Sequence, residues 1–540
     1  MKKLLAVILC VVFVCCLFSG CGSSSNNSSN TTTAGDAVAG AGSGDAEADS
    51  APTDPAAKAI ADRIADAQKT GKYPEVTMAF MNFTGAPSGV HDVEAEISKN
   101  TEKSLGLDVK LNILDVATYK QQMTLMLSSG ENLDLFSAIS LGYSSCINNG
   151  YCVDLEKDSL ISTYGKGILD TMDKTYIDGC RVGGVLYGLP NQRDMAGGLD
   201  CFAIGAQYLD GIGFDYKSLY KNPSDEIIHS DIATINDIFS KLHQKYPDKT
   251  VYGPQAATLL QANNFDPIGG DNFGVLLNDA QDLKVQDLFS SDTYINFCNR
   301  IYQWNKAGYI SKDAMTNNIG PTAQVKANTT MAYATAGKPG IRAQESGLCG
   351  QPMIIFQLGK DFLKSGGISG FAWCVNTASK DPVAAMQFLN SCYSDPVISD
   401  LLCWGIEGKH YKVTSDGHID FADGVDASSS TYFNNVNWEL PNQFIAKIFA
   451  GNELTIWDRM KDFNANATVS KAVGFTFNNT SVSAEYTALT NIYTQYQKQM
   501  EYGFTDPKVG IPEMVEKMKS AGLQKYMDTK QSQLDSWAKK

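Results

Sequence analysis

Between residues 76 and 139 the chain alternates short apolar runs with segments of helical periodicity. The apolar runs lie at 76–83, 109–113 and 133–139, and the helical patterns lie at 92–105 and 119–127. In the first run, apolar residues occupy both faces, which suits a strand buried inside a sheet. Strands that alternate with helices favour parallel pairing, with the helices on the faces of the sheet. The sequence therefore predicts a parallel α/β sheet, and ligands of such sheets bind beyond the carboxyl ends of the strands.

The N-terminal segment has the pattern of a secretion signal. Lys2 and Lys3 precede an apolar run, Leu4–Phe18, and Cys21 follows two small residues later. The run is too short to span a bilayer comfortably and ends in small residues. We expect residues 1–20 to be a lipoprotein signal peptide and Cys21 to be the lipid-attachment residue. An ordinary cleaved signal or an uncleaved anchor is the alternative.

The segment 21–57 is poor in large apolar residues and rich in Ser, Asn, Thr, Gly, Ala and Asp. Such a composition cannot bury enough surface to offset the entropy of ordering, so we expect a disordered tether. A short helix is predicted at 58–69. Together with Cys21, this predicts a protein that is lipid-anchored to the membrane, on the extracellular face of the cytoplasmic membrane.

Length and charge limit the class of the folded part. About 480 residues follow the tether, which is more than one hydrophobic core usually supports, so at least two domains are expected. No later run is apolar and long enough for a membrane span. The formal net charge is −15, which does not suit nucleic acid or anionic lipid as a partner.

Six ordered segments carry a family resemblance. They are Val182–Pro190, Tyr208–Asp215, Ala378–Leu389, Gly405–Tyr411, Asn437–Phe444 and Gln531–Trp537. From about Tyr73 to the C-terminus, the chain resembles the family 1 extracellular solute-binding proteins of ABC importers. It is most similar to their large Gram-positive lipoprotein branch with an extended C-terminal region.

The resemblance implies a type II periplasmic-binding-protein-like clamp of two α/β lobes, with crossover hinge strands and a helical C-terminus. Carried over, lobe 1 takes residues 58–192 plus 369–412, and lobe 2 takes 193–368 plus 413–540. The ligand, which we expect to be an oligosaccharide, would lie between the lobes. A monomer that closes by a hinge and delivers its ligand to ABC permease subunits is implied.

A sugar site needs aromatic platforms and planar polar groups that form paired hydrogen bonds. Asn191, Arg193 and Asp194 follow the first of the six segments, where a crossover is implied, and are the polar candidates. Arg193 could clamp vicinal hydroxyls or a carboxylate. An Arg193–Asp194 ion pair with a purely structural role is the alternative.

Four further residues are ligand-binding candidates, namely Asn82, Tyr143, Trp373 and Trp438. Asn82 and Tyr143 follow expected strand ends, Trp373 lies beside the second implied crossover, and Trp438 belongs to one of the six segments. Core packing is the alternative for each aromatic residue. Asp271 either reaches the ligand or holds a turn, and the turn is favoured.

The sequence lacks the motifs of common enzymes. It has no Gly-x-Ser-x-Gly elbow, no Walker loop and no Ser-x-x-Lys, and its five histidines show no metal-ligand spacing. We therefore expect a binding protein without catalysis, metal or cofactor. A peptide or other non-sugar receptor of the same fold is the first alternative, a surface glycoside hydrolase the second, and an adhesin the third.

Overall fold

The computed structural model describes residues 54–82, 86–221, 226–255, 259, 262–426, 429–434 and 436–539. The expected signal peptide, Cys21 and the tether up to residue 53 lie outside these described residues. The first helix, α1, spans Pro55–Thr70 and begins before the expected residue 58. It does so because Asp54 caps it by accepting the Ala56 N–H at 3.1 Å, and because proline suits a first helical turn. Residues 54–57 therefore belong to the helix and its cap, not to the tether.

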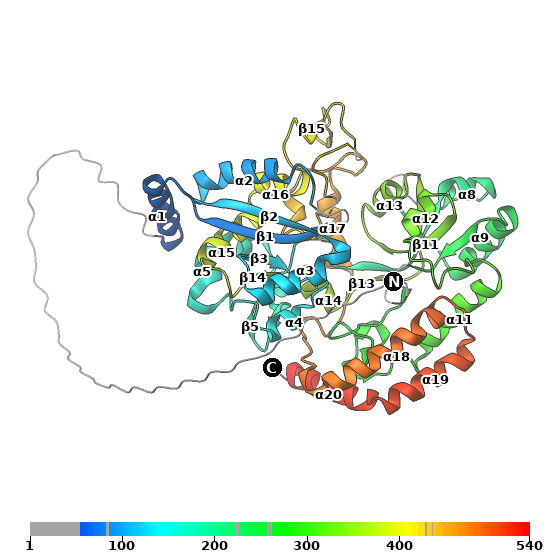
Figure 1. The fold of residues 1–540 in the computed structure, drawn as a ribbon. Coiled ribbons are helices and arrows are strands. Elements are labelled where there is room, and N and C mark those ends of the chain that lie inside the picture. The colour runs from blue at the N-terminus through cyan, green and yellow to red at the C-terminus, as the bar shows by residue number, and fades with distance from the viewer. Residues whose placement is uncertain are drawn as a thin grey trace, which may run out of the picture. The chain divides into compact units, whose positions relative to one another are not determined.

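The first sheet has the order β14-β3-β1-β2 (Figure 1). Strands β1 (Glu75–Asn82), β2 (Asp108–Asp115) and β3 (Leu135–Ser137) are parallel, and β14 (Trp373–Val375) is antiparallel to β3. Helices α2 (Val90–Ser104) and α3 (Val116–Ser129) connect the three parallel strands. This confirms the predicted parallel α/β sheet and places Asn82 and Ser137 at its carboxyl-end edge.

The other elements around the first sheet are shorter. They are α4 (Tyr143–Asn148), α5 (Leu160–Tyr164), α6 (Lys166–Thr171), α7 (Lys174–Asp178), the hairpin β4 (Arg181–Val182) and β5 (Val185–Leu186), α14 (Gly366–Ser369), α15 (Pro382–Ser394), α16 (Pro396–Trp404), the hairpin β15 (Tyr411–Val413) and β16 (Ile419–Phe421), and α17 (Ile456–Asn466). The β4–β5 turn has positive φ at Gly183 and Gly184, as a tight hairpin requires.

The second sheet is mixed and contains seven strands among the described residues. Its main path is β17 (Thr468–Val469), β13 (Asp361–Leu363), β6 (Gly197–Gly205), β11 (Thr330–Gly337) and β8 (Thr250–Gly253). Strands β12 (Met353–Gln357) and β7 (Ile227–His229) lie off this path, with β12 on β6 and β7 on β12. Because β8 and β11 are parallel, their carboxyl ends meet at one edge.

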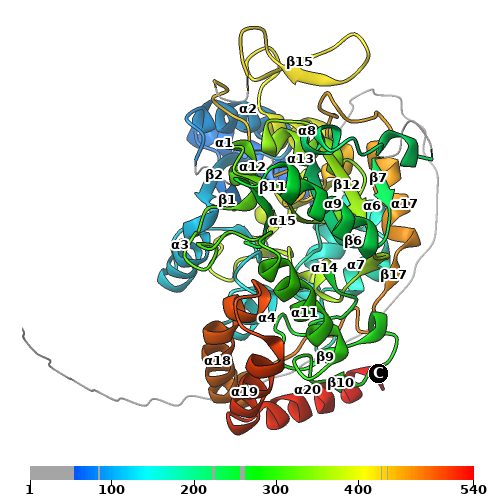
Figure 2. The same ribbon diagram turned by 90° about the vertical axis from the view of Figure 1, so that its right-hand side faces the viewer.

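Further elements belong to the second sheet's surroundings. They are α8 (Ala206–Gly211), α9 (Ile232–Lys245), β9 (Val275–Leu276), β10 (Val285–Gln286), α11 (Asp292–Lys306), α12 (Pro321–Lys326), α13 (Ile341–Cys349), α18 (Ser483–Glu501), α19 (Pro507–Ser520) and α20 (Leu523–Ala538). Of the three C-terminal helices, α18 and α19 pack against α11, and α20 packs against α18, α19 and β10 (Figures 1 and 2).

The buried apolar side chains form two large clusters. The first takes its members from residues 76–196 and 363–467, and the second from 199–362 and 472–534. The chain therefore passes between the clusters three times, near 196–199, 362–363 and 467–472. Residues 419–467 were expected in the second lobe. Six of their buried apolar side chains pack in the first cluster, three form a small cluster of their own, and none belongs to the second cluster.

The three passages lie next to one another in a single sheet. Strand β13 is antiparallel to β6 and parallel to β17, and each of these strands lies at one passage. Segments far apart in sequence are therefore held together by backbone hydrogen bonds where the chain crosses between the two cores. Such a three-strand crossover is a short element that can absorb a change in the angle between two bodies.

The C-terminal helix α20 is fixed to the second core by a buried ion pair. Lys530 is fully buried, and its ammonium group donates to Asp271 Oδ1 at 2.9 Å and to the Gly274 carbonyl at 2.9 Å. Asp271 also accepts the Phe273 N–H at 2.8 Å, so it holds the expected turn as well. Among the helices that the structure describes, none is apolar over a length sufficient to cross a bilayer.

Candidate functional site

The segment 437–440 closes over the carboxyl-end edge of the first sheet. The Glu439 carboxyl accepts the Met81 N–H from the end of β1 at 3.2 Å, and the Glu439 carbonyl accepts the Trp373 indole N–H from β14 at 2.9 Å. The Trp438 carbonyl accepts a hydrogen bond from the Asn191 side-chain amide. This segment therefore links the first sheet to the first crossover passage.

An aromatic pair lies where this segment meets α14. The rings of Phe371 and Trp438 pack edge to face, with centroids 5.6 Å apart, and both side chains are partly exposed. The Arg193 guanidinium lies 4.1 Å from the centroid of the Phe371 ring. Partly exposed rings beside hydrogen-bonding groups are what a sugar face and its rim of hydroxyls require.

Arg193 and Asp194 are buried side by side but bond to different groups. Arg193 donates to the Gly367 carbonyl at 2.9 Å and to the Asp194 backbone carbonyl. The Asp194 carboxylate pairs instead with Lys338 at 3.0 Å and accepts the Gln443 side-chain amide at 3.2 Å. Burial pushes the pKa of Asp194 up, but the positive charges of Lys338 and Arg193 outweigh burial and lower it below the usual range.

A buried asparagine on α17 fixes the backbone of the same passage. The Asn464 side chain accepts the N–H groups of Met195 and Ala196 at 2.8 and 3.1 Å. It also donates to the Arg193 carbonyl at 2.7 Å. Three backbone groups of the passage are thus satisfied by one side chain more than 260 residues away in sequence.

Four buried polar atoms in this region have no hydrogen-bond partner in the described part of the chain. They are Asn191 Oδ1, Arg193 Nε, Asn437 Oδ1 and Glu439 Oε2. Buried polar groups are normally paired, and an unpaired one costs about 1–3 kcal/mol. We call Asn191, Arg193, Asp194, Phe371, Trp438 and Glu439 the crossover site, because these residues combine unused hydrogen-bonding capacity with exposed aromatic surface.

The structure separates the sequence-predicted residues into two groups. Asn191, Arg193, Asp194 and Trp438 meet in the crossover site. Asn82 is fully buried beside it, with its amide donating to Asn434 at 3.2 Å.

Tyr143 and Trp373 lie in the first core. Tyr143 is 4% exposed and bonds the Cys180 carbonyl at 2.8 Å, and Trp373 is fully buried. A ligand cannot stack on either ring in this conformation, so the core-packing alternative describes their present positions. Cys21 lies outside the described residues.

Phe371, Glu439 and Lys338 are the residues that sequence reasoning missed. The sequence pointed to Trp373 as the stacking ring, but the partly exposed ring belongs to Phe371, two residues earlier in the same segment. Glu439 lies within the Asn437–Phe444 segment. Lys338 follows β11 and has no local sequence signal, because its partner Asp194 lies 144 positions earlier.

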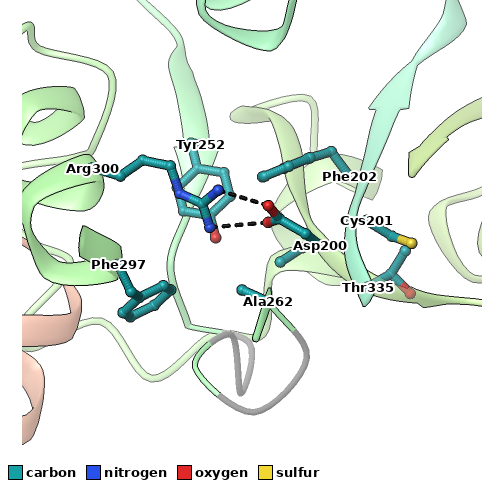
Figure 3. A pocket seen from close by; sticks show the side chains of 9 residues that line it. Asp200, Cys201, Phe202, Tyr252, Ala262, Phe297, Arg300 and Thr335 are labelled. Carbon is teal, nitrogen blue, oxygen red and sulfur yellow. Dashed lines mark hydrogen bonds and ion pairs between the residues drawn. The ribbon is translucent and has the colours of Figure 1, made fainter. Parts of the chain in front are cut away.

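A second polar cluster lies at the carboxyl ends of β8 and β11 (Figure 3). Arg300 of α11 forms a bidentate pair with Asp200 of β6, at 2.8 and 2.9 Å, and Tyr252 and Phe297 lie around it. The side chains leave no space there for even a water molecule, so this pocket cannot hold a sugar as it stands. In the described residues, no group of three or more His, Cys, Asp and Glu side chains is arranged to bind a metal ion.

Comparison with known proteins identifies the fold class. The N-glycan transport solute-binding protein NgtS of Streptococcus pneumoniae is similar to this chain with a TM-score of 0.74 and 23% identity, over 86% of this chain and 99% of that chain. Its complex with Man5GlcNAc gives 0.68 at 23% identity, over 86% and 99% of the two chains. The chain therefore has the two-domain fold of solute-binding proteins, which confirms the expected fold class.

Two sequence comparisons add to this. A protein of Streptococcus pneumoniae serotype 4 named carbohydrate ABC transporter substrate-binding protein is 24% identical over 483 residues, which are 88% of this chain and 93% of that protein. A family model described as a domain of unknown function, DUF3502, matches residues 471–539. That range contains α18, α19 and α20.

Proposed function

We propose that the protein is the substrate-binding component of an ABC importer, which captures an oligosaccharide and delivers it to permease subunits. The observation that carries this is the crossover site, where the Phe371–Trp438 pair lies beside buried polar atoms that lack partners among the described residues. The two-domain fold and the similarity to a carbohydrate-binding transport protein over nearly its whole length support the same function.

The proposed division follows the two cores. Lobe 1 takes residues 58–192 plus 369–412, and lobe 2 takes 193–368 plus the C-terminal helices. We place residues 413–467 in lobe 1, because six of their buried apolar side chains pack in the first cluster and none packs in the second. Closure of the two lobes about the three-strand crossover would cover a ligand held at the crossover site.

Calorimetric titration of the purified chain against a glycan panel tests the function. The panel contains Man5GlcNAc, Man1GlcNAc, kestose and an alginate oligosaccharide, with short peptides as the contrasting class. We expect micromolar binding of at least one glycan, which corresponds to about −8 kcal/mol, and a smaller radius of gyration with ligand by small-angle scattering. Binding of peptides alone would favour the non-sugar receptor, and binding without compaction would favour the adhesin.

The site is proposed to bind without catalysis. Asp194 is committed to Lys338 and Gln443, and Glu439 is fully buried, so neither carboxyl group is free to act on a bound glycosidic bond. Incubation of each panel glycan with the protein, followed by chromatography, should return the glycan unchanged. Release of a shorter glycan would establish the hydrolase alternative.

The location is proposed from the N-terminal sequence. We propose that Cys21 carries lipid and holds the protein, as a monomer, on the extracellular face of the cytoplasmic membrane. Cells that express the full chain should retain it in the detergent phase after phase partition, and Cys21→Ala should release it. Retention of the Cys21→Ala variant would contradict lipid attachment at this residue, and light scattering would test the monomer.

A further inference from the structure

Glu439 lies at the point where the aromatic platform is joined to the first sheet. Its side chain bonds the end of β1 through the Met81 N–H, and its backbone carbonyl bonds the Trp373 indole of β14. The preceding residue is Trp438, whose carbonyl is held by Asn191 and whose ring packs on Phe371. The orientation of the Trp438 ring therefore depends on how Glu439 is held.

No cation among the described residues compensates the Glu439 carboxyl. The side chain is fully buried, and no Lys, Arg or His in the described part of the chain forms an ion pair with it. The groups facing it are the Met81 N–H of β1, Ser137 of β3 and the Tyr119 phenol of α3. An ionised carboxylate in such a place would be uncompensated, so the folded site favours the neutral acid.

We propose that Glu439 is a positioning residue for the ligand platform: its uncharged carboxyl group holds the segment 437–440 on the first sheet and thereby keeps Trp438 against Phe371. This inference rests on the proposed function of the crossover site, and it adds a regulation of that site by pH. Ionisation of Glu439 releases the segment, because the single Met81 N–H stabilises the buried carboxylate less than water does. The platform then loses its geometry while the rest of the fold remains.

The pH range follows from the environment of the acid. Burial raises the pKa of Glu439 to about 8, and the Met81 N–H and the nearby Ser137 side chain oppose this only in part. If only the neutral form holds the platform, about one molecule in ten is competent one pH unit above that value, and the apparent affinity falls about tenfold. Binding should therefore be constant from pH 6 to 7 and weaken between pH 7 and 9.

Glu439→Gln is the decisive variant, since the amide has the shape of the neutral acid but cannot ionise. Its control is Glu501→Gln on α18. Glu501 is also buried, with its pKa raised to about 7 by burial, but it bonds Tyr493 and Gln497 in the C-terminal helices and lies outside the crossover site. Both variants alter the pH dependence of stability, but only the first should alter the pH dependence of the platform.

The experiment has two arms. The first measures the dissociation constant of the best panel glycan, with Man5GlcNAc as the starting probe, from pH 6 to 9. The second needs no ligand. It measures fluorescence from pH 6 to 9 in the unaltered chain and in Trp438→Phe, and the difference between the two is the signal of Trp438. We expect a transition near pH 8 in the unaltered chain and in Glu501→Gln, and no transition in Glu439→Gln.

The outcomes separate the inference from the proposed function. A transition of the Trp438 signal that persists in Glu439→Gln overturns the positioning role, as does a flat signal in the unaltered chain. If no glycan binds at any pH while the Trp438 transition is present and depends on Glu439, the sugar-binding function fails and the positioning role stands. Loss of the pH dependence of affinity in both Gln variants would assign the effect to global stability.

Discussion

The Lys530–Asp271 pair offers a test of how the C-terminal helices are held. Replacing Lys530 by Met removes a cation that is fully buried, whereas replacing Asp271 by Asn removes its anion. Removing one partner of a buried pair costs about 3–5 kcal/mol, because the other charge is left uncompensated. The two single variants should not be equal.

The surroundings of the two charges determine the order. Without Lys530, the Asp271 carboxylate keeps the Phe273 N–H at 2.8 Å and the Tyr526 hydroxyl at 2.7 Å, so Lys530→Met should cost about 3 kcal/mol. Without Asp271, the ammonium group keeps the Gly274 carbonyl at 2.9 Å and two aromatic rings, so Asp271→Asn should cost about 5 kcal/mol at neutral pH. The double variant should cost less than the sum.

The pH dependence gives a second criterion. Burial lowers the pKa of Lys530 and the charge of Asp271 opposes this, so Asp271→Asn lowers the pKa further. A lysine whose folded pKa is below its unfolded value gains stability as pH rises between the two values, because the unfolded chain binds the extra proton. The deficit of Asp271→Asn should therefore shrink from pH 7 to pH 10. That of Lys530→Met should grow instead, because the unaltered chain gains stability through its lysine and the Met variant has no lysine to titrate.

Urea unfolding followed by far-ultraviolet circular dichroism measures both effects. Lys525→Met on the same helix is the matched control, since its pair with Glu485 at 2.5 Å leaves the lysine 62% exposed and should contribute less than about 1 kcal/mol. Equal losses for the two buried variants, or a constant Asp271→Asn deficit across pH, would refute the reasoning.

Three further predictions concern the crossover site. The pKa of Glu439 is raised to about 8 from an ordinary 4.5, so the unaltered chain loses stability as pH rises from 5 to 8. Glu439→Gln does not ionise, so its free energy of unfolding in urea should rise by about 4 kcal/mol relative to the unaltered chain over that range. Trp438→Ala should weaken calorimetric binding of the best glycan about tenfold, with unchanged folding by circular dichroism. Asn464→Ala leaves three backbone groups unpaired and should lower the unfolding free energy by about 3 kcal/mol.

The strand and helix pattern of the first sheet could be predicted because it is local. Apolar residues at the strand period and at the helical period are read from neighbouring positions, and the structure places β1, β2 and β3 where those patterns lie. Asn191, Arg193 and Asp194 were predicted at a crossover because the segment before them resembles a known hairpin. The β4–β5 hairpin is present there.

Pairings between distant positions could not be predicted. Glu439 bonds Met81 across 358 positions, and Lys530 bonds Asp271 across 259 positions. No local sequence pattern predicts either contact. Phe371 lies in the short connection between α14, which ends at Ser369, and β14, which begins at Trp373. Trp373 is therefore part of the buried sheet, and Phe371 is not. Residue type alone favoured the larger ring, which the fold uses in its core.

The position of the unpartnered polar atoms connects binding to closure. Asn191 and Arg193 lie directly before β6, where the chain passes from the first core to the second and runs beside the other two passages. A ligand shifts the equilibrium between two conformations only by its difference in affinity for them. Each bond to a buried group that otherwise lacks a partner contributes about 1–3 kcal/mol, so two such bonds can offset a difference of a few kcal/mol between open and closed forms. In the proposed function, polar groups left unsatisfied at the crossover would make the fold less stable without ligand, and the closed form would depend on a ligand that can bond them.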